Sequence, residues 1–272
     1  MLERWRSSLG AAVLSIAVLV GAGAQPGAAQ EFAPGADFQL AAAAYLAKSY
    51  DQAFAQFQSL ADTGMREAQY MLGLMHHQGQ ATPRNLAKAA EWFFRAARQG
   101  EASAQYELGV LYAKGQAVQR DDAQAIKWFL QAAKQGHQQA EYNLAVMYLL
   151  GAGVVESSKN AAAWFRRAAN QGFADAQYQL GLLYLQGQGA GQDLVEAFKW
   201  WTLAADGGSR LAARALNTLA QELSSYELED AAQRVTAWRE KHAPETLATE
   251  AGDTDGDSAA AAALNPPPSG GP

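Results

Sequence analysis

The sequence predicts an all-α protein in which pairs of antiparallel helices repeat every 36 residues and stack into an α-solenoid. Three observations predict this fold: residue columns with a fixed spacing, apolar side chains at helical intervals, and residues typical of helix ends at each boundary. Successive copies match without an insertion or a deletion. The clearest columns are Ala68, Ala104, Ala140, Ala176 and Ala212; Gly64, Gly100, Gly136, Gly172 and Gly208; and Trp92, Trp128, Trp164 and Trp200.

Residues 1–29 have the layout of a secretory signal peptide. Two arginines near the start precede an apolar run from Leu9 to Gly23, and small residues at 22–24 and 27–29 offer two cleavage sites. The run has about 15 residues, whereas a helix that spans a membrane needs about 20, so an uncleaved anchor is the weaker alternative. We therefore expect a periplasmic or secreted protein that begins near Gln25 or Gln30 and does not span the membrane after cleavage.

A shorter helix pair is predicted at residues 33–64, before the first full repeat. Phe38–Ala47 and Tyr50–Thr63 have helical patterns, and only Lys48 and Ser49 join them. A repeat array needs atypical end units that cover its terminal core. We therefore expect this pair to cap the N-terminal end of the array.

Residues 65–208 contain four full repeats of two helices each. In the second copy, Ala104–Lys114 has apolar stripes at helical spacing, and Gly115 is placed to end this helix in a left-handed conformation. Gly109 lowers the helix propensity but allows the close approach of a neighbouring helix. The second helices should begin after residues whose side-chain oxygens accept free N–H groups of the first turn. These N-caps are Asn85, Asp121, Ser157 and Asp193, and the predicted buried stripe of the second copy is Ala125, Trp128, Phe129, Ala132 and Ala133.

Residues 209–243 are predicted to form a C-terminal capping pair, with helices at Arg210–Leu223 and Glu227–Lys241. The last helix should turn one stripe inward. This stripe consists of Leu228, Ala232, Val235 and Trp238. Residues 244–272 are mainly Ala, Asp, Gly, Pro and Ser, and they lack the apolar side chains that a core needs. We expect this acidic tail to be disordered.

The repeat unit resembles the Sel1-like repeat. The resemblance rests on Ala104-Gln-Tyr-Glu-Leu-Gly-Val-Leu-Tyr112, Gly115, Asp121, Ala125-Ile-Lys-Trp-Phe129 and Ala132-Ala-Lys-Gln-Gly136, and it covers roughly Ala68 to Gly208. The sequence departs from the pattern at His76, at Ala145 and at 214–217. The short end units resemble the related tetratricopeptide repeat. The resemblance implies a right-handed α-solenoid that acts as an interaction scaffold, and exported bacterial members of the family have a similar layout.

The composition excludes several classes of function. The chain has 27 acidic and 21 basic residues and no basic block, which argues against nucleic acid as a partner. It has no cysteine, which excludes disulfide scaffolds, cysteine catalysis and cysteine-ligated metals. His76 and His77 are adjacent, and neighbouring helical residues point about 100° apart, so they cannot share one metal ion. His76 stands in a tyrosine column, which favours a packed side chain. We predict no catalytic residues, no metal site and no cofactor.

The resemblance implies that the first helix of each repeat lines a concave face. A ladder of tyrosines would lie there, beside residues that differ between otherwise matching copies and are therefore free to set specificity. The predicted partner-binding residues are Tyr70, His77, Tyr106, Lys114, Gln139, Tyr142, Leu150, Tyr178 and Gln186. An equally weighted alternative is that the tyrosines only fill the seam between repeats.

Two functions fit these patterns and the roles that the resemblance implies. The preferred hypothesis is an exported, non-catalytic scaffold that binds another protein of the cell envelope, such as a sensor or an assembly component that regulates signalling or exopolysaccharide synthesis. The alternative is a scaffold that binds a polysaccharide or peptidoglycan. An enzyme is least supported, because the sequence shows no convergent cluster of titratable residues.

Overall fold

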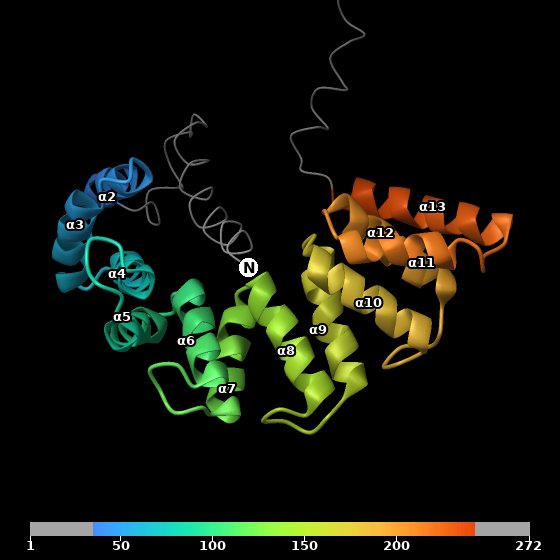
Figure 1. Cartoon of the computed structure of the whole chain (residues 1–272), viewed down its shortest axis with the longest axis horizontal. Coiled ribbons are helices and arrows are strands. Elements are labelled where there is room, and N and C mark those ends of the chain that lie inside the picture. Colours follow the sequence, from blue (N-terminus) through green and yellow to red (C-terminus); the bar gives the residue numbers. More distant parts are fainter. Residues whose placement is uncertain (1–34, 243–272) are drawn as a thin grey trace, which may run out of the picture. The chain divides into compact units, whose positions relative to one another are not determined.

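The computed structural model describes residues 35–242, and every regular element in this range is a helix (Figure 1). The predicted signal peptide at 1–29 and the predicted tail at 244–272 lie outside the described residues. No helix within 35–242 is long and apolar enough to cross a membrane. The helices are α2 Ala36–Leu46, α3 Tyr50–Asp62, α4 Arg66–Gln78, α5 Leu86–Arg98, α6 Ala102–Lys114, α7 Asp122–Lys134, α8 Gln138–Leu150, α9 Ser158–Asn170, α10 Ala174–Gln186, α11 Leu194–Asp206, α12 Arg210–Leu219 and α13 Ser225–Lys241.

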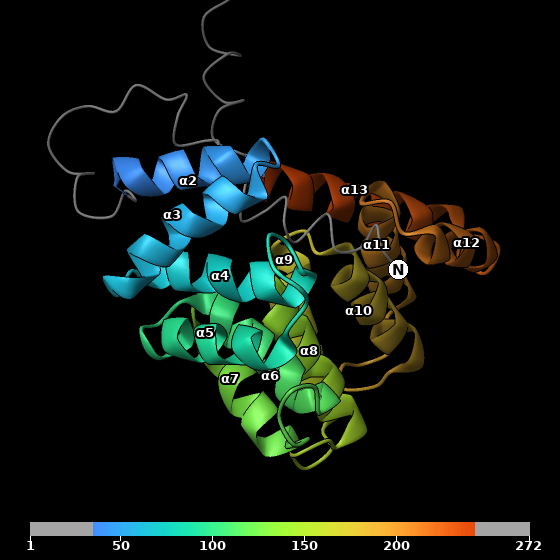
Figure 2. The ribbon, with the colours of Figure 1, turned by 60° about the vertical axis from the view of Figure 1, so that its left-hand side comes forward.

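The described residues divide into two compact units, unit 1 before residue 165 and unit 2 from residue 165 on, with the boundary inside α9. In the described part of unit 1, each helix from α2 to α7 packs against the next one along the chain (Figure 2). In unit 2, α10, α11 and α12 pack in the same order, and α13 returns to pack against α11. Each unit is thus a stack of helix pairs, as the 36-residue spacing predicts.

The predicted helix ends are present. The side-chain oxygens of Asn85, Asp121, Ser157 and Asp193 each accept a hydrogen bond from the N–H group three residues later, at 2.8–3.2 Å. The first helices end at glycines with φ between 62° and 74°. Glycine adopts this left-handed conformation readily, because it has no side chain that would clash with the backbone. These glycines are Gly79, Gly115, Gly151 and Gly187. The sequence therefore sets both ends of the helix pair through local side-chain and backbone chemistry.

The core of each repeat centres on the aromatic ring that follows the tryptophan. Phe93, Phe129 and Phe165 are buried, and Trp201 occupies the same position in the last repeat. A Cβ atom at Gly109 would lie only 2.5 Å from the Phe129 ring. The missing side chain therefore makes room for this ring, which comes from the second helix of the same repeat.

The tryptophan column is less buried than predicted. Trp128 and Trp200 are 8% and 3% exposed, but Trp92 and Trp164 are only half-buried. Adjacent helical positions point about 100° apart, so the tryptophan cannot face the same way as the ring that follows it. It packs towards the preceding second helix instead. Trp128 of α7, for example, meets Phe94 of α5 edge-on, with 6.1 Å between ring centroids.

Two predictions for the C-terminal pair are wrong. Helix α12 ends at Leu219 rather than Leu223, because the chain must turn before Ser224, which starts α13 through a reciprocal capping box with Glu227. In α13, Ala231 is buried and Ala232 is exposed, so the inward stripe runs through 228, 231, 235 and 238. At the N-terminal end, α2 and α3 begin and end within two residues of the predicted positions.

Buried glutamines join neighbouring pairs, a feature that the periodicity alone does not reveal. The Gln69 amide donates to the Ala61 carbonyl at 3.3 Å, and the Gln105 amide donates to the Ala97 carbonyl at 3.1 Å. Both acceptors lie in the last turn of the preceding second helix, where carbonyl groups lack helical partners. In the sequence, these contacts correspond to an Ala-Gln pair that recurs at 68–69, 104–105 and 176–177.

Candidate interaction surface

The first helices of the repeats carry the predicted tyrosine ladder. In unit 1, Tyr70 of α4 is half-buried, with its ring 5.9 Å from that of Phe93. Tyr106 of α6 lies 5.9 Å from Phe129 and stacks on His137 at 4.6 Å. Both rings therefore contribute to the packing between helices.

Burial also sets the chemistry of the two hydroxyl groups. It raises the pKa of Tyr106 to about 12, with a further increase from Glu107 and an opposing interaction with Asn143. Burial raises the pKa of Tyr70 well above its ordinary value, and the charges of Glu107 and Glu101 raise it further. Both hydroxyl groups therefore stay protonated at neutral pH and can donate hydrogen bonds.

Beside these tyrosines, α6 holds a buried carboxyl group. Glu107 is 8% exposed, and burial raises its pKa to about 7, although Lys114 lowers it. Burial also lowers the pKa of His77 in α4, and the charges of Arg84 and Lys114 lower it further. Glu107, Lys114, His77 and Tyr70 thus interact across two repeats, and we call these four residues the inner cluster. Its carboxyl group can hold or release a proton near neutral pH.

The other predicted binding residues lie outside the inner cluster. Gln139 and Tyr142 are half-buried in α8, and Leu150 at the end of this helix is 72% exposed. Tyr178 and Gln186 belong to α10 in unit 2, where Tyr178 is half-buried and Gln186 is exposed. Of the predicted residues in the first two repeats, Tyr70, His77 and Lys114 belong to the inner cluster, whereas Tyr106 packs beside it on Phe129 and His137.

Glu107 is the member of the inner cluster that the repeat pattern did not single out. Its position holds Met71, Asn143 and Gln179 in the other copies. Such variation beside a repeated tyrosine marks a position that is free of a shared packing role. This variation is the signal that could have identified Glu107 from the sequence.

The histidines outside the inner cluster have local structural roles. His76 is buried, meets Phe54 edge-on at 5.4 Å and pairs with the Thr82 hydroxyl at 3.2 Å, in agreement with a packed side chain. His137 caps α8 by accepting a hydrogen bond from the Ala140 N–H, and burial lowers its pKa to about 4. Within residues 35–242, no group of three or more His, Cys, Asp or Glu could hold a metal ion.

The repeat geometry is matched by a known family. The model of the Sel1 repeat matches residues 66–101, 102–137, 138–173 and 174–209. The chain belongs to the Sel1 repeat family. The four matches begin 36 residues apart, so the repeat length and the right-handed α-solenoid expected from the sequence are confirmed. Sel1 repeats imply a scaffold for protein–protein interaction.

Two solved structures illustrate the likeness. A Sel1 repeat protein from Oxalobacter formigenes is 28% identical over 74% of this chain and 84% of that chain, with a TM-score of 0.65. A protective antigen of uropathogenic Escherichia coli strains, which has an SLR fold, is 28% identical over 87% of this chain, with a TM-score of 0.52. The present chain spans 58% of that antigen's length. No curated protein sequence matches this chain significantly.

Proposed function

We propose that this Sel1 repeat protein is an exported, non-catalytic scaffold that binds a partner protein of the cell envelope, such as a sensor or an assembly component. The inner cluster and the neighbouring first helices of unit 1 form the binding surface. The observation that carries the proposal is the grouping of His77, Glu107 and Lys114. These residues differ from their counterparts in the other repeats, and the charge of Lys114 affects the pKa of both His77, one repeat earlier, and Glu107 in its own helix. Repeat proteins bind through extended surfaces of this kind.

The packing of the tyrosines favours a protein over a polysaccharide as the partner. A sugar ring that stacks on an aromatic side chain needs an open ring face. Tyr106 contacts both Phe129 and His137. Exposed side chains such as Lys114 and Leu150 are therefore the better contacts, and they suit a protein surface with polar and apolar groups.

The export part of the proposal rests on the signal-peptide pattern at residues 1–29. Cell fractionation followed by intact-mass measurement tests it. The expected product is a chain that begins near Gln25 or Gln30 in the periplasmic or secreted fraction. Full-length chain in the cytoplasm would contradict export and the envelope partner.

Capture from an envelope extract tests the binding surface. The tagged wild-type chain should retain a stoichiometric protein partner, and Lys114→Glu with Leu150→Asp should retain at least tenfold less. The matched control is Lys134→Glu with Val155→Asp, at exposed positions outside the inner cluster. Equal recovery by all three chains would contradict the proposed surface. Retention on a glycan resin without any protein partner would instead support the polysaccharide or peptidoglycan alternative.

A further inference from the structure

Glu107 in α6 has a buried carboxyl group without a partner. The residue is 8% exposed, and within residues 35–242 its carboxyl group forms no hydrogen bond and no ion pair. Buried carboxylates are normally paired with a cation or with hydrogen-bond donors. Some polar side-chain atoms in this range are fully enclosed and unpaired, and they belong to Gln56, Gln80, Trp128 and Gln177. The Glu107 oxygens are not among them, so they retain access to solvent and a partner can reach them.

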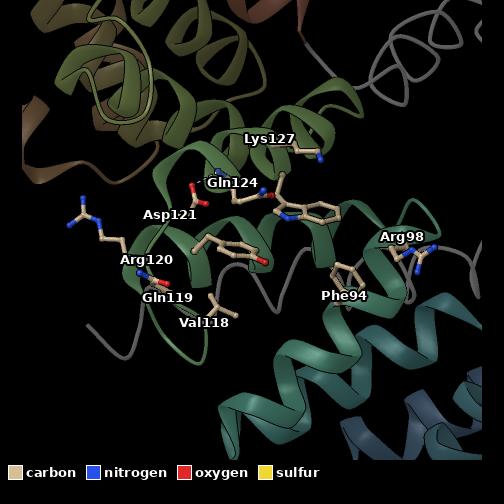
Figure 3. Close-up of a pocket in the computed structure, with 10 residues that line it drawn as sticks. Phe94, Arg98, Val118, Gln119, Arg120, Asp121, Gln124 and Lys127 are labelled. Carbon is tan, nitrogen blue, oxygen red and sulfur yellow. Dashed lines mark hydrogen bonds between the residues drawn. The ribbon is translucent and has the colours of Figure 1, made fainter.

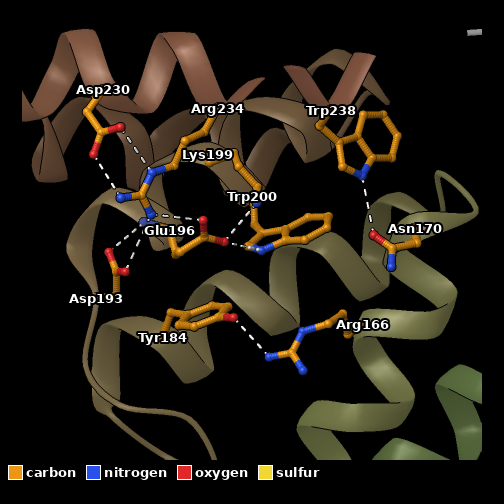
Figure 4. A network of polar contacts seen from close by, with 10 residues as sticks. All are labelled: Arg166, Asn170, Tyr184, Asp193, Glu196, Lys199, Trp200, Asp230, Arg234 and Trp238. Atoms are coloured by element: carbon orange, nitrogen blue, oxygen red, sulfur yellow. Dashed lines mark hydrogen bonds and ion pairs between the residues drawn. The ribbon is translucent and has the colours of Figure 1, made fainter. Parts of the chain in front are cut away.

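Unit 2 shows how this chain satisfies a half-buried carboxylate (Figure 4). Glu196 of α11 accepts hydrogen bonds from the Lys199 ammonium at 2.8 Å and from the Trp200 N–H group at 3.1 Å. Arg234 of α13 lies 3.0 Å from its other oxygen. Trp238 of α13 meets Trp200 edge-on at 6.3 Å, so α13 covers this position of the repeat. A lysine ammonium is therefore a partner that a carboxylate of this protein already uses.

The matching position in unit 1 is a groove between the second helices α5 and α7 (Figure 3). Trp128 is the counterpart of Trp200, and the groove beside it has a volume of about 830 Å³. Its acidic lining residue Asp121 caps α7 by accepting a hydrogen bond from the Gln124 N–H group at 2.9 Å. The Trp128 Nε1 atom is fully enclosed, so no ligand in the groove reaches it. The groove therefore offers a ligand neither an unpaired carboxylate nor an accessible indole donor.

The other acidic residues of α4 and of the start of α6 already have cations. Arg66 lies 2.8 Å from Glu67 and 4.0 Å from Glu101. The Glu101 carboxylate also accepts a hydrogen bond from the Ser103 N–H group at 3.4 Å. Glu107 is thus the acidic residue of these two helices that is left without a cation.

A positively charged region lies seven residues further along α6. Lys114 is exposed and forms no ion pair within the described part of the chain. The Arg84 guanidinium donates to the His77 carbonyl at 3.0 Å. Burial and the charges of Arg84 and Lys114 lower the pKa of His77, so both cations lie near this histidine. Seven residues of helix span about 10 Å and return to nearly the same face, so Glu107 and Lys114 present opposite charges about 10 Å apart.

We propose that the inner cluster binds an extended segment of the partner protein, with a lysine on Glu107 and an acidic residue on Lys114. This inference rests on the proposed function, because it names the chemistry of the partner at that surface. The ligand ammonium donates to the Glu107 carboxylate and to the Tyr70 hydroxyl oxygen. In an extended chain, two residues three positions apart are separated by about 10 Å, which matches the spacing of the two charges. Opposite charges at the two ends also fix the register of the bound segment.

The small opening at Glu107 favours lysine over arginine. Lysine carries a compact ammonium group on an unbranched stem, whereas the guanidinium of arginine is planar and wider. Tyr70 and Tyr106 lie close to the carboxyl group, since burial and the charge of Glu107 raise the pKa of both hydroxyl groups. Their rings suit the apolar stem of a lysine whose charged end reaches the carboxylate.

Binding of this lysine requires the ionised form of Glu107. Burial raises the pKa of Glu107 to about 7, although Lys114 lowers it, so binding near neutral pH releases a proton. The titratable and charged groups that face the carboxyl group are Tyr70 from α4 and Tyr106 and Lys114 from α6. The uncharged Asn143 of α8 interacts with Tyr106. Both tyrosines stay protonated between pH 6 and pH 8, so Glu107 is the group that changes.

The probe is the peptide acetyl-Lys-Gly-Gly-Glu-amide, which is titrated into the full chain at low salt. NMR follows the side-chain carboxyl ¹³C resonance of Glu107, which is assigned by its absence from Glu107→Gln, and the amide resonances of α6 in both chains. We expect a Kd on the order of 1 mM at pH 8, as for a short peptide. The wild type should bind about tenfold more weakly at pH 6, where Glu107 is mostly protonated. Glu107→Gln should bind roughly tenfold more weakly than the wild type at pH 8 and should lose this pH dependence, and any effect of His77 remains in it.

Two controls separate the site from general effects of charge. A peptide with norleucine in place of lysine keeps the stem without the ammonium and should bind roughly tenfold more weakly. Glu91→Gln removes an exposed carboxylate from α5 and should bind as the wild type does. Equal binding of the norleucine peptide, equal affinity of the wild type at pH 6 and pH 8, or no binding at about 10 mM would each overturn the proposal. Tighter binding of the arginine peptide would overturn the choice of lysine.

Capture from the envelope extract separates this inference from the proposed function. Glu107→Gln should retain roughly tenfold less of the protein partner than the wild type does. Equal recovery of a partner by the two chains would overturn the lysine site and leave the scaffold proposal intact. Recovery of no protein partner by the wild type would contradict the proposed function, and the peptide titration would still decide the chemistry of the site.

Discussion

The groove at Trp128 in unit 1 and its counterpart at Trp200 in unit 2 have the same backbone elements and different covers. In unit 2, α13 supplies Trp238 and Arg234, and every indole N–H group at this position is hydrogen-bonded. In unit 1, Phe94 stays exposed and the Trp128 N–H group stays unpartnered. The comparison shows that the same position of the repeat can be covered by a capping helix or can form a surface that is exposed to solvent. The tryptophan and the helix ends are the same in both units, so the differences lie in the cover that α13 supplies and in a few side chains around the tryptophan.

The largest expected effect comes from removing each tryptophan. Trp200→Ala removes the contact with Trp238 and leaves Glu196 without its indole donor, so we expect a loss of about 4 kcal/mol in the free energy of unfolding. Trp128→Ala removes a ring that is 8% exposed and packs in the core of unit 1, but whose N–H group is unsatisfied, so a smaller loss of about 3 kcal/mol is expected. Urea unfolding measures both values. A greater loss for Trp128→Ala would contradict the comparison.

Buried carboxyl groups extend the comparison. Glu196 in unit 2 contacts Arg234 and Lys199, whereas for Glu107 in unit 1 only the charge of Lys114 opposes the effect of burial on the pKa. The pKa of Glu107 is raised to about 7 in the folded protein, so the folded state binds the proton more tightly than the unfolded state. Its contribution to stability is therefore fully present below the ordinary pKa near 4.5 and is lost as the pH rises to 7.

Glu107→Gln should remove this dependence on pH. We expect the variant to gain about 2 kcal/mol relative to the wild type between pH 5 and pH 8. Urea unfolding at both pH values gives the difference, and the contributions of His137 and other groups cancel between the two chains. Parallel stability profiles for the two chains would show that the Glu107 carboxyl group is not buried in the folded protein.

Opening the covered groove should make it resemble the open one. Trp238→Ala removes the aromatic ring that α13 places on Trp200, and we expect a loss of about 2 kcal/mol. Hydrogen exchange should increase in α13 more than in α10, because α13 loses its main aromatic contact with α11. Uniform protection across unit 2 would mean that α13 is held by other contacts.

The smallest expected effect comes from giving Trp128 the acceptor that Trp200 has. Gln124→Glu should stabilise the unliganded protein by about 0.5 kcal/mol, because the new carboxylate accepts the buried N–H group. Thermal unfolding at low and high salt measures the effect. A destabilised variant would show that the carboxylate does not reach the indole.

Much of the fold could be predicted from the sequence because local chemistry repeats along it. The N-caps at Asn85 and Asp121 and the left-handed glycines at 79 and 115 act within one or two turns, so they can be recognised without tertiary information. The end of α12 could not be found this way. Leu223 continues an apolar pattern, but the capping box of Ser224 and Glu227 starts the next helix there.

The candidate sites were harder to predict, since they depend on contacts between repeats. The variable positions His77 and Lys114 can be listed from the sequence, but Glu107 cannot, because its burial follows from the packing of helices. The different directions of Trp128 and Phe129 also escape the pattern, which shows both as apolar. Only the structure reveals that Phe129 packs inside its own helix pair, whereas Trp128 packs against the preceding second helix and also lines a groove.

An exchange of groove chemistry tests the central claim most directly. The triple variant Phe94→Arg, Arg98→Asn and Gln124→Glu gives the groove at Trp128 the side chains of its counterpart at Trp200. Fluorescence anisotropy then measures the binding of a labelled peptide of residues 224–242, which carries the α13 side chains that cover Trp200. The account predicts that the triple variant, still folded, binds this peptide at least tenfold more tightly than the wild type does. Equal binding by the two folded chains would contradict the claim that these side chains favour the cover that α13 supplies.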